Sequence, residues 1–184
     1  MRVIAGIAKG RKLKYPRGST LRPSSAKVRG AIFSMLASAD ADMRIVLDLY
    51  AGTGSFGIEA MSRGAEWVDF VEKEHRHCST IRSNLDILGM SASANVHCQS
   101  VEYALKSLDC VYGVVFLDPP YSIGKLDSVM HQLATSPVNN KNTIIVVEHS
   151  VRHTMTEAYG KFRLGRARRY GETSVSMYQQ EVHP

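Results

Sequence analysis

The sequence predicts an α/β protein with a mostly parallel sheet that helices cover on both faces. Between residues 45 and 147, short apolar runs alternate with segments of helical periodicity, and this alternation is typical of right-handed β-α-β units. A glycine-rich turn directly follows the first of these runs, at residues 51–57. A chain of 184 residues has the length of one domain with some appended structure.

The apolar spacing gives the expected elements in order. Residues 1–23 read as a basic extension with a short strand at 2–5, a turn or hairpin and a loop, and residues 24–184 as the main domain. Ser24 is a plausible N-cap for a helix in which Val28, Ile32, Met35 and Leu36 recur at helical spacing. Further strands are expected at 45–50, 67–71, 95–98, 111–117 and 143–147, with helices ending near 62 and spanning 73–88, 101–108 and 126–134. Strands at 162–167 and 173–179 predict an antiparallel hairpin at the sheet edge.

Composition and charge narrow the class of protein. The chain is 44% hydrophobic, which excludes wholesale disorder, and it has no apolar run of the roughly 18–20 residues that a bilayer crossing needs. The first residues do not have the long apolar core of a secretory signal, and the three cysteines lack metal-ligand spacing, so we expect a cytoplasmic protein without a structural metal. Net charges of +8 for 1–44, −5 for 45–150 and +3 for 151–184 place basic segments at both ends, where phosphate backbones commonly bind.

The glycine-rich turn predicts a site for an adenosine cofactor. Residues 48–57 read DLYAGTGSFG and match G-x-G-x-x-G between a strand and a helix. Glu72, at the end of the next strand, could accept the hydroxyls of a ribose. Asp48 stands at the tip of the first strand, where a carboxylate would repel a pyrophosphate but suits a cationic sulfonium amino acid. This favours S-adenosylmethionine over a nicotinamide dinucleotide.

A second motif follows the strand expected at 111–117. Asp118-Pro119-Pro120-Tyr121 should face the same crevice as the glycine turn, because ligands bind beyond the carboxyl ends of the strands. Proline has no N–H donor, so the turn presents acceptors only, and the ring of Tyr121 offers a surface on which a base can stack. Acceptors beside an aromatic plane suit a planar exocyclic amine, whose two N–H groups they would bind.

These motifs together resemble the RsmD family of bacterial enzymes, which methylate the N2 of a guanine in 16S ribosomal RNA. The resemblance extends over nearly the whole chain and is carried by residues 2–6, 10–13, 21–24, 28–29, 48–57, 59–65, 71–73, 118–121, 147–149 and 170–173. It implies a class I, Rossmann-like methyltransferase with a seven-stranded sheet and S-adenosyl-L-methionine as cofactor. It also implies small-subunit ribosomal RNA as partner, alone or in an assembled or assembling 30S subunit. We expect a monomer.

The resemblance, combined with the motifs, assigns the candidate residues. The target base would meet Asp118, Pro119, Pro120 and Tyr121. The cofactor would be bound by Asp48, Tyr50, Gly52, Thr53, Gly54, Gly57, Glu72, Lys73, Ser100 and Val101. RNA would contact the basic residues Arg11, Lys12, Lys14, Arg22 and Arg29.

Two departures from the family pattern and two alternative functions stay open. Ser100 stands where the family often has an acidic residue against the adenine amine, and Gly30 stands where it usually has glutamate. The same chemistry on DNA adenine or on a protein amide is one alternative, because such enzymes share the motif that ends in two prolines and an aromatic residue. The other, from a different class, is an NAD(P)-dependent oxidoreductase.

Overall fold

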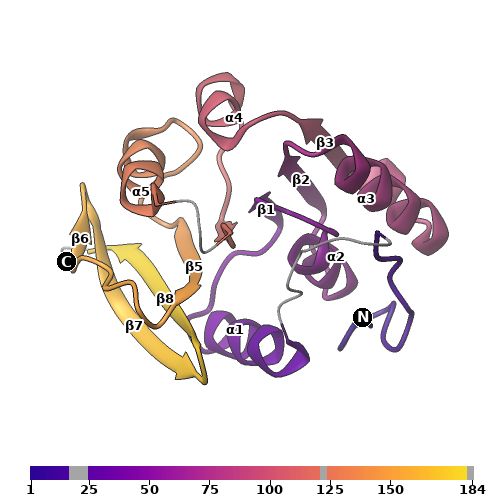
Figure 1. The fold of residues 1–184 in the computed structure, drawn as a ribbon, viewed down its shortest axis with the longest axis horizontal. Helices are drawn as coiled ribbons and strands as arrows, with labels where there is room; N and C mark the ends of the chain where they lie inside the picture. Colours follow the sequence, from indigo (N-terminus) through magenta and orange to yellow (C-terminus); the bar gives the residue numbers. More distant parts are fainter. Residues whose placement is uncertain (17–24, 121–123, 182–184) are drawn as a thin grey trace.

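The computed structural model describes residues 1–16, 25–120 and 124–181, which form a sheet with helices on both sides (Figure 1). Its strand order is β3-β2-β1-β4-β5-β8-β7-β6. The pairs from β3 to β5 are parallel and those from β5 to β6 antiparallel. The strands are β1 (Ile45–Leu49), β2 (Trp67–Glu72), β3 (Ala94–Cys98), β4 (Val114–Leu117), β5 (Ile144–Ser150), β6 (Ala158–Tyr159), β7 (Phe162–Tyr170) and β8 (Thr173–Gln180). The helices are α1 (Ala26–Ser38), α2 (Ser55–Ser62), α3 (His75–Leu88), α4 (Val101–Ser107) and α5 (Leu126–Thr135), with a short 3-10 turn at Ser91–Ser93.

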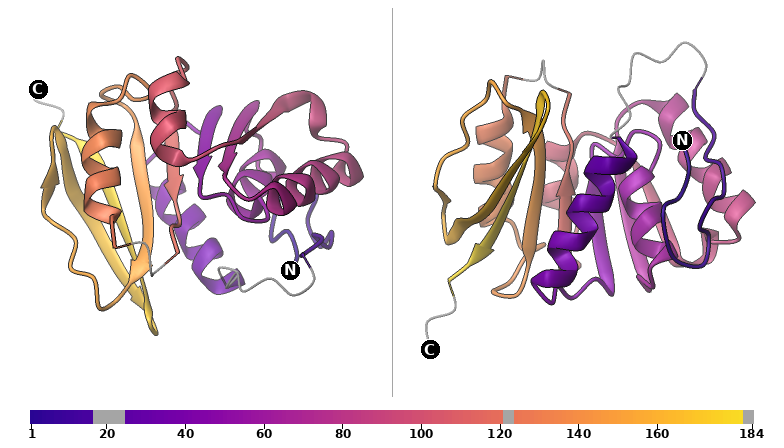
Figure 2. Two further views of the ribbon diagram at one scale, coloured as in Figure 1. Left: turned by 45° about the horizontal axis from the view of Figure 1, so that its top comes forward. Right: turned by 90° about the horizontal axis from the view of Figure 1, so that it is seen from below.

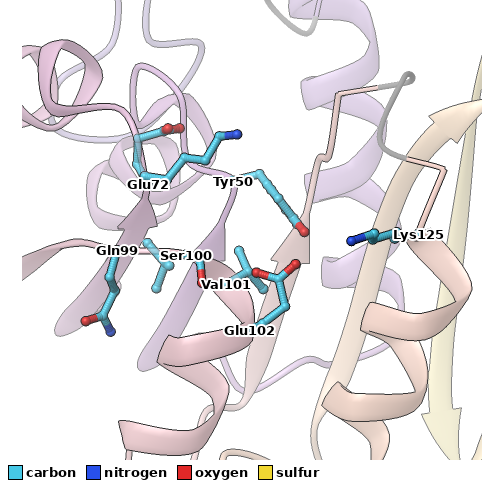
Figure 3. Close-up of a pocket in the computed structure, with 9 residues that line it drawn as sticks. Tyr50, Glu72, Gln99, Ser100, Val101, Glu102 and Lys125 are labelled. Atoms are coloured by element: carbon cyan, nitrogen blue, oxygen red, sulfur yellow. The ribbon is translucent and has the colours of Figure 1, made fainter.

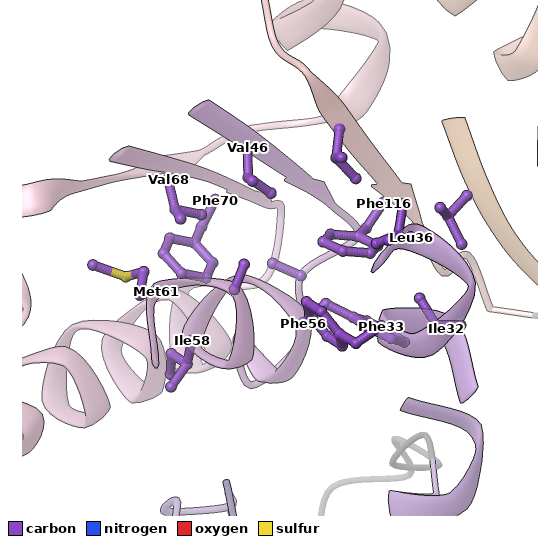
Figure 4. Packing of buried hydrophobic residues seen from close by; sticks show 14 of the residues in the cluster. Ile32, Phe33, Leu36, Val46, Phe56, Ile58, Met61, Val68, Phe70 and Phe116 are labelled. Carbon is purple, nitrogen blue, oxygen red and sulfur yellow. The ribbon is translucent and has the colours of Figure 1, made fainter. Parts of the chain in front are cut away.

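Helices cover both faces of the sheet (Figure 2), and alternate residues of the strands lie in two separate cores, one on each face. On β1, Val46 belongs to the core under α1, α2 and α3, whereas Leu47 belongs to the core under α4 and α5. This pattern follows from the two-residue period of a strand. In the first core, Phe116 stacks on Phe56 with ring centroids 5.1 Å apart and lies 5.5 Å from Phe33 (Figure 4). These rings fix α1 and α2 over the end of β4.

The predicted order of strands and helices is confirmed, with three local corrections. The N-cap of α1 is Ser25, not Ser24, and its hydroxyl accepts from the backbone N–H of Val28. Two-residue β6 adds an eighth strand to the seven that were expected. Residues 2–5 do not form a strand; a single bridge joins Arg2 to Lys12.

The N-terminal segment packs on α2 instead of joining a sheet. The buried carboxylate of Glu59 accepts the backbone N–H groups of Ile4 at 2.7 Å and Ala5 at 3.0 Å, so these donors are unavailable to a neighbouring strand. Gly6 has a φ of +77°, and a Cβ there would lie 1.6 Å from the carbonyl oxygen of Ser62. Apolar side chains of the segment lie in the same core as α1 and α2, so it shares the main hydrophobic core.

Gly30 lies in the interior of α1, and a Cβ built there meets nothing within 4 Å. Gly30→Ala is therefore expected to raise the free energy of unfolding by about 0.5–1 kcal/mol, because alanine loses less backbone entropy in a helix. Urea denaturation measures this. Gly57→Ala is the contrasting variant: its Cβ would lie 2.3 Å from the ring of Phe70, so a loss of about 1–3 kcal/mol is expected. A destabilised Gly30→Ala protein would contradict this account.

Candidate active site

The glycine turn between β1 and α2 has the backbone that its sequence predicted. Gly52 and Gly54 have φ values of +56° and +78°, in the left-handed region that glycine enters without strain. Tyr50 also has a positive φ, +57°, which is uncommon for a residue with a side chain. Gly57 serves a different purpose, since its missing side chain lets α2 pack against Phe70 of β2.

Asp48 holds the α2 end of this turn through a hydrogen bond to its backbone. Its Oδ2 accepts the backbone N–H of Gly57 at 2.9 Å, and Oδ1 is buried with no hydrogen-bond partner among the described residues. Burial raises the pKa of Asp48 to about 8, the Gly57 N–H opposes this shift, and the nearby charge of Glu72 adds to it. A cation beside Oδ1 would stabilise the charged carboxylate, so the site is built to accept positive charge.

Glu72 holds the other side of the turn. Its Oε2 accepts the backbone N–H of Gly52 at 2.9 Å, and Oε1 accepts that of Glu74 at the same distance. His77 lies 3.6 Å from Oε1. Each carboxylate oxygen has a second lone pair, so Glu72 can also accept from a ligand hydroxyl.

A cavity of about 320 Å³ opens beside the turn, at the carboxyl ends of β1, β2 and β3 (Figure 3). Figure 3 shows the hydroxyl of Tyr50, the carboxylate of Glu102 and the amine of Lys125 directed toward one another. The Tyr50 hydroxyl is buried without a partner among the described residues, and burial, with the charge of Glu102, raises its pKa to about 12. The cavity is lined by Tyr50, Val71, Glu72, Lys73, Gln99, Ser100, Val101, Glu102 and Lys125.

Half of the predicted cofactor residues line this cavity and half support it. Tyr50, Glu72, Lys73, Ser100 and Val101 are at its surface. Asp48, Gly52, Thr53, Gly54 and Gly57 belong to the β1 strand end and the turn, and they are not among its lining residues. Ser100 is the N-cap of α4, with its hydroxyl accepting from Tyr103 at 3.3 Å.

The predicted base-binding turn begins next to the glycine turn. The Asp118 N–H lies 3.5 Å from the carbonyl oxygen of Leu49, the last residue of β1, so Asp118 and Tyr50 follow neighbouring strand ends. Asp118 is half-buried, Pro119 buried and Pro120 exposed. Tyr121 lies outside the described residues.

Of the predicted RNA contacts, Arg29 is wrong. Its guanidinium is buried, donating to the carbonyl oxygen of Arg2 and to the sulfur of Met1, both at 2.8 Å. Burial lowers its pKa, while Glu59 and Glu148 oppose this. Arg29 is therefore unavailable to a nucleic acid and ties the N-terminus to α1. Arg11, Lys12 and Lys14 are exposed, and Arg22 lies outside the described residues.

Asn84 is a residue that the sequence did not reveal. It is buried in α3, where its Oδ1 accepts the backbone N–H of Lys14 at 2.7 Å. Its Nδ2 donates to the carbonyl oxygens of Lys14 and Thr53, both at 3.3 Å. Asn84 thus joins the N-terminal segment to the glycine turn. An asparagine within a helical pattern carries no local signal of such a role.

The histidines near the site have separate partners. His75 Nδ1 lies 3.3 Å from the sulfur of Cys98, whereas His77 lies beside Glu72. His149 is buried, with Nδ1 donating to the carbonyl oxygen of Ser150 and Nε2 bonded to the hydroxyl of Ser176. Within 1–16, 25–120 and 124–181, no group of three or more metal-ligating side chains could hold an ion. Over the same ranges, no helix has the length and apolarity of a membrane span.

Comparison with known proteins agrees with this geometry. A family model described as "Conserved hypothetical protein 95" matches residues 1–179. The "Putative rRNA methyltransferase YlbH" of Bacillus subtilis (strain 168) is 36% identical over 183 residues, which cover 98% of this chain and 99% of that protein. The "Ribosomal RNA small subunit methyltransferase D" of Escherichia coli (strain K12) is 29% identical, covering 99% of this chain and 91% of that protein. Among solved structures, "Putative methyltransferase yhhF from Escherichia coli" has a TM-score of 0.87 and 30% identity, covering 100% of this chain and 99% of that one.

The parallel sheet, the glycine turn after β1 and the cavity beside it define a class I methyltransferase fold. Within that class, the match over residues 1–179 and the relatives of nearly equal length show that the chain belongs to the RsmD family.

The raised pKa of Asp48 predicts a pH-dependent stability. In the unfolded chain the carboxyl loses its proton near pH 4, whereas the folded protein retains it up to about pH 8. Unfolding therefore releases a proton between these values, and the free energy of unfolding falls as the pH rises through this window. Asp48→Asn removes this proton release, so between pH 5 and pH 8 the wild type should lose at least about 1 kcal/mol more than the variant.

Urea denaturation at a series of pH values measures this difference. Asp109→Asn, at an exposed carboxylate, is the control and should follow the wild type. Parallel curves for the wild type and Asp48→Asn would show that Asp48 is ionised in the folded protein.

Proposed function

We propose that this protein transfers a methyl group from S-adenosylmethionine to the exocyclic N2 amine of a guanine in small-subunit ribosomal RNA. The observation that carries the proposal is the turn at Asp118, which directly follows β4 next to the start of the glycine turn and whose two prolines have no backbone N–H donor. The names of the relatives, which include small-subunit ribosomal RNA methyltransferases, support the substrate class. We infer a monomer acting on naked RNA or on an assembled or assembling subunit.

The described residues fit the cofactor. The unpaired Asp48 Oδ1 suits the cationic methionine end, and Glu72, which already holds Gly52, can accept from ribose hydroxyls. Ser100 and Val101 line the part of the cavity assigned to the adenine. Glu102 supplies a carboxylate to the same cavity, two positions beyond Ser100. Bound there, the cofactor supplies an electrophilic methyl group on a sulfonium.

The residues of the chain then position the amine. The Asp118 carboxylate accepts one amine hydrogen and the Pro119 carbonyl the other, which turns the nitrogen lone pair toward the methyl group. The carboxylate also stabilises the positive charge that develops on the nitrogen as the new N–C bond forms and the S–C bond breaks. The surplus proton passes to Asp118 or to water. The guanine must be unpaired or flipped out to reach this turn.

Identification of the product tests the function. Purified protein is incubated with methyl-labelled S-adenosylmethionine and, separately, undermethylated small ribosomal subunits, naked ribosomal RNA, DNA and protein. Recovery of label as N2-methylguanosine from subunits or RNA supports the proposal. Label in DNA or protein overturns the substrate but keeps the cofactor. Binding of NAD(P), and not of S-adenosylmethionine, overturns both.

Asp118→Ala is expected to abolish methyl transfer while leaving cofactor affinity within about twofold, because Asp118 contacts the base and not the cofactor. Single-turnover transfer and calorimetric binding of S-adenosylmethionine measure the two effects. Asp109→Ala, an exposed carboxylate variant, is the control. Wild-type turnover in Asp118→Ala would contradict the assigned role.

Replacing Arg11, Lys12 and Lys14 by glutamine should weaken RNA binding and flatten its dependence on salt concentration, because all three side chains are exposed and cationic. Filter binding of ribosomal RNA over a range of salt concentrations measures the slope. An unchanged slope would place the RNA surface elsewhere on the protein.

A further inference from the structure

Strand β7 contains four arginines and no acidic residue, and three of them lie toward its carboxyl end: Arg166, Arg168 and Arg169. We propose that these three, called here the β7 arginine edge, bind the phosphate backbone of the RNA strand whose guanine enters the site. This inference rests on the proposed function and adds to it a second RNA surface on the C-terminal hairpin.

The pairing of the strands puts this edge level with the turn at Asp118, called here the catalytic turn. The last paired residue of β4 precedes Asp118, which puts Asp118 level with Glu148 on β5. Glu148 pairs with Val175 on β8, and Val175 pairs with Arg168 on β7. Arg168 therefore lies at the same height along the strands as Asp118 and three strands away from it, a distance of about 14 Å across the sheet. A stacked strand covers this distance with about four nucleotides.

The arginine edge is accessible. β6 pairs only with Phe162 and Arg163, so further along β7 the described residues include no partner strand on its outer side. Arg166, Arg168 and Arg169 are all exposed. Cross-strand partners lie on the same face of a sheet. The partners of Arg166 and Arg168, Met177 and Val175, belong to the core that also contains α1, so these two arginines project from that face. Arg169 projects from the opposite face. Their guanidinium groups thus border the edge on both sides.

No described carboxylate forms an ion pair with these three arginines. Arg168 donates to its neighbour's carbonyl oxygen at 3.3 Å, and Arg169 donates to that of Gly171 at 2.9 Å. These hydrogen bonds leave further N–H groups and the full positive charge available. Guanidinium forks match the oxygens of phosphate, which makes arginine well suited to an RNA backbone.

Of the N-terminal basic residues, Arg11 lies far from the turn at Asp118. Arg11 donates to the carbonyl oxygen of Ile87, near the end of α3. Since α3 begins next to Glu72 at the catalytic side of the sheet, Arg11 is about 18 Å along the helix from that side. The hairpin and the N-terminal segment also occupy opposite ends of the sheet (Figure 1). RNA that reaches Asp118 therefore meets the β7 arginine edge on the side away from α3.

A pair of matched variants tests this. Arg166→Gln with Arg168→Gln removes two charges at the catalytic end of β7, and Lys161→Gln with Arg163→Gln removes two exposed charges at the other end. The probes are undermethylated small ribosomal subunits and naked small-subunit ribosomal RNA. Filter binding gives affinity and salt slope, and methyl transfer gives kcat and KM.

The first variant should raise the Kd and KM for RNA about tenfold and reduce the salt slope by about 1.4, at roughly 0.7 for each phosphate that is no longer neutralised. Its kcat at saturating RNA and its affinity for S-adenosylmethionine should stay within twofold of the wild type. The Lys161 and Arg163 variant should keep the wild-type slope.

Equal effects of the two variants would overturn the proposal, since they would indicate only general charge attraction. Wild-type RNA affinity together with self-association of the first variant would also overturn it, because the arginines would then serve to prevent pairing between edge strands. Failure of the proposed function is separate: it is recognised in the wild type, as an absence of label in RNA.

Discussion

Two buried carboxylates hold the glycine turn, and the geometry of the site depends on them. Asp48 accepts the backbone N–H of Gly57 and Glu72 accepts that of Gly52, so the turn is fastened at both of its ends. Both acids leave water to do so, which is costly unless their oxygens find donors. One oxygen of Asp48 has none among the described residues. A positive charge beside this oxygen would stabilise the ionised form of Asp48, and the proposed cofactor carries such a charge.

The N-terminal segment is part of this arrangement, not an independent appendage. Glu59 binds its backbone to α2, and Asn84 connects Lys14 to the carbonyl oxygen of Thr53 in the glycine turn. Arg29, buried beside Met1 and Arg2, fixes the beginning of the chain to α1. Hydrogen bonds therefore connect this segment both to α2 and to the glycine turn.

Membership of the RsmD family accounts for the fold and the motifs, and the geometry adds what is particular to this chain. Ser100 caps α4 at the position where the family often has an acid, and Glu102 brings a carboxylate into the same cavity. Gly30 lies in the helix α1 without a close neighbour at its Cβ position, so the second departure leaves the packing of α1 intact. Positive charge is presented at both ends of the sheet, by the N-terminal segment and by the β7 arginine edge.

The order of strands and helices and the glycine turn could be predicted from the sequence, as could the candidate residues Asp48, Glu72 and Asp118, because each prediction depends on local spacing and backbone preference. The sequence could not determine where the arginines lie. Arg29 and Arg168 both look like surface cations in the sequence, yet one is buried against Met1 and the other is level with Asp118. The roles of Glu59, Asn84 and Lys125 could not be predicted from the sequence either, because their partners or cavity neighbours lie on other elements. Burial and strand register arise only when distant segments pack together, so which charges are available to a ligand becomes visible only in the folded structure.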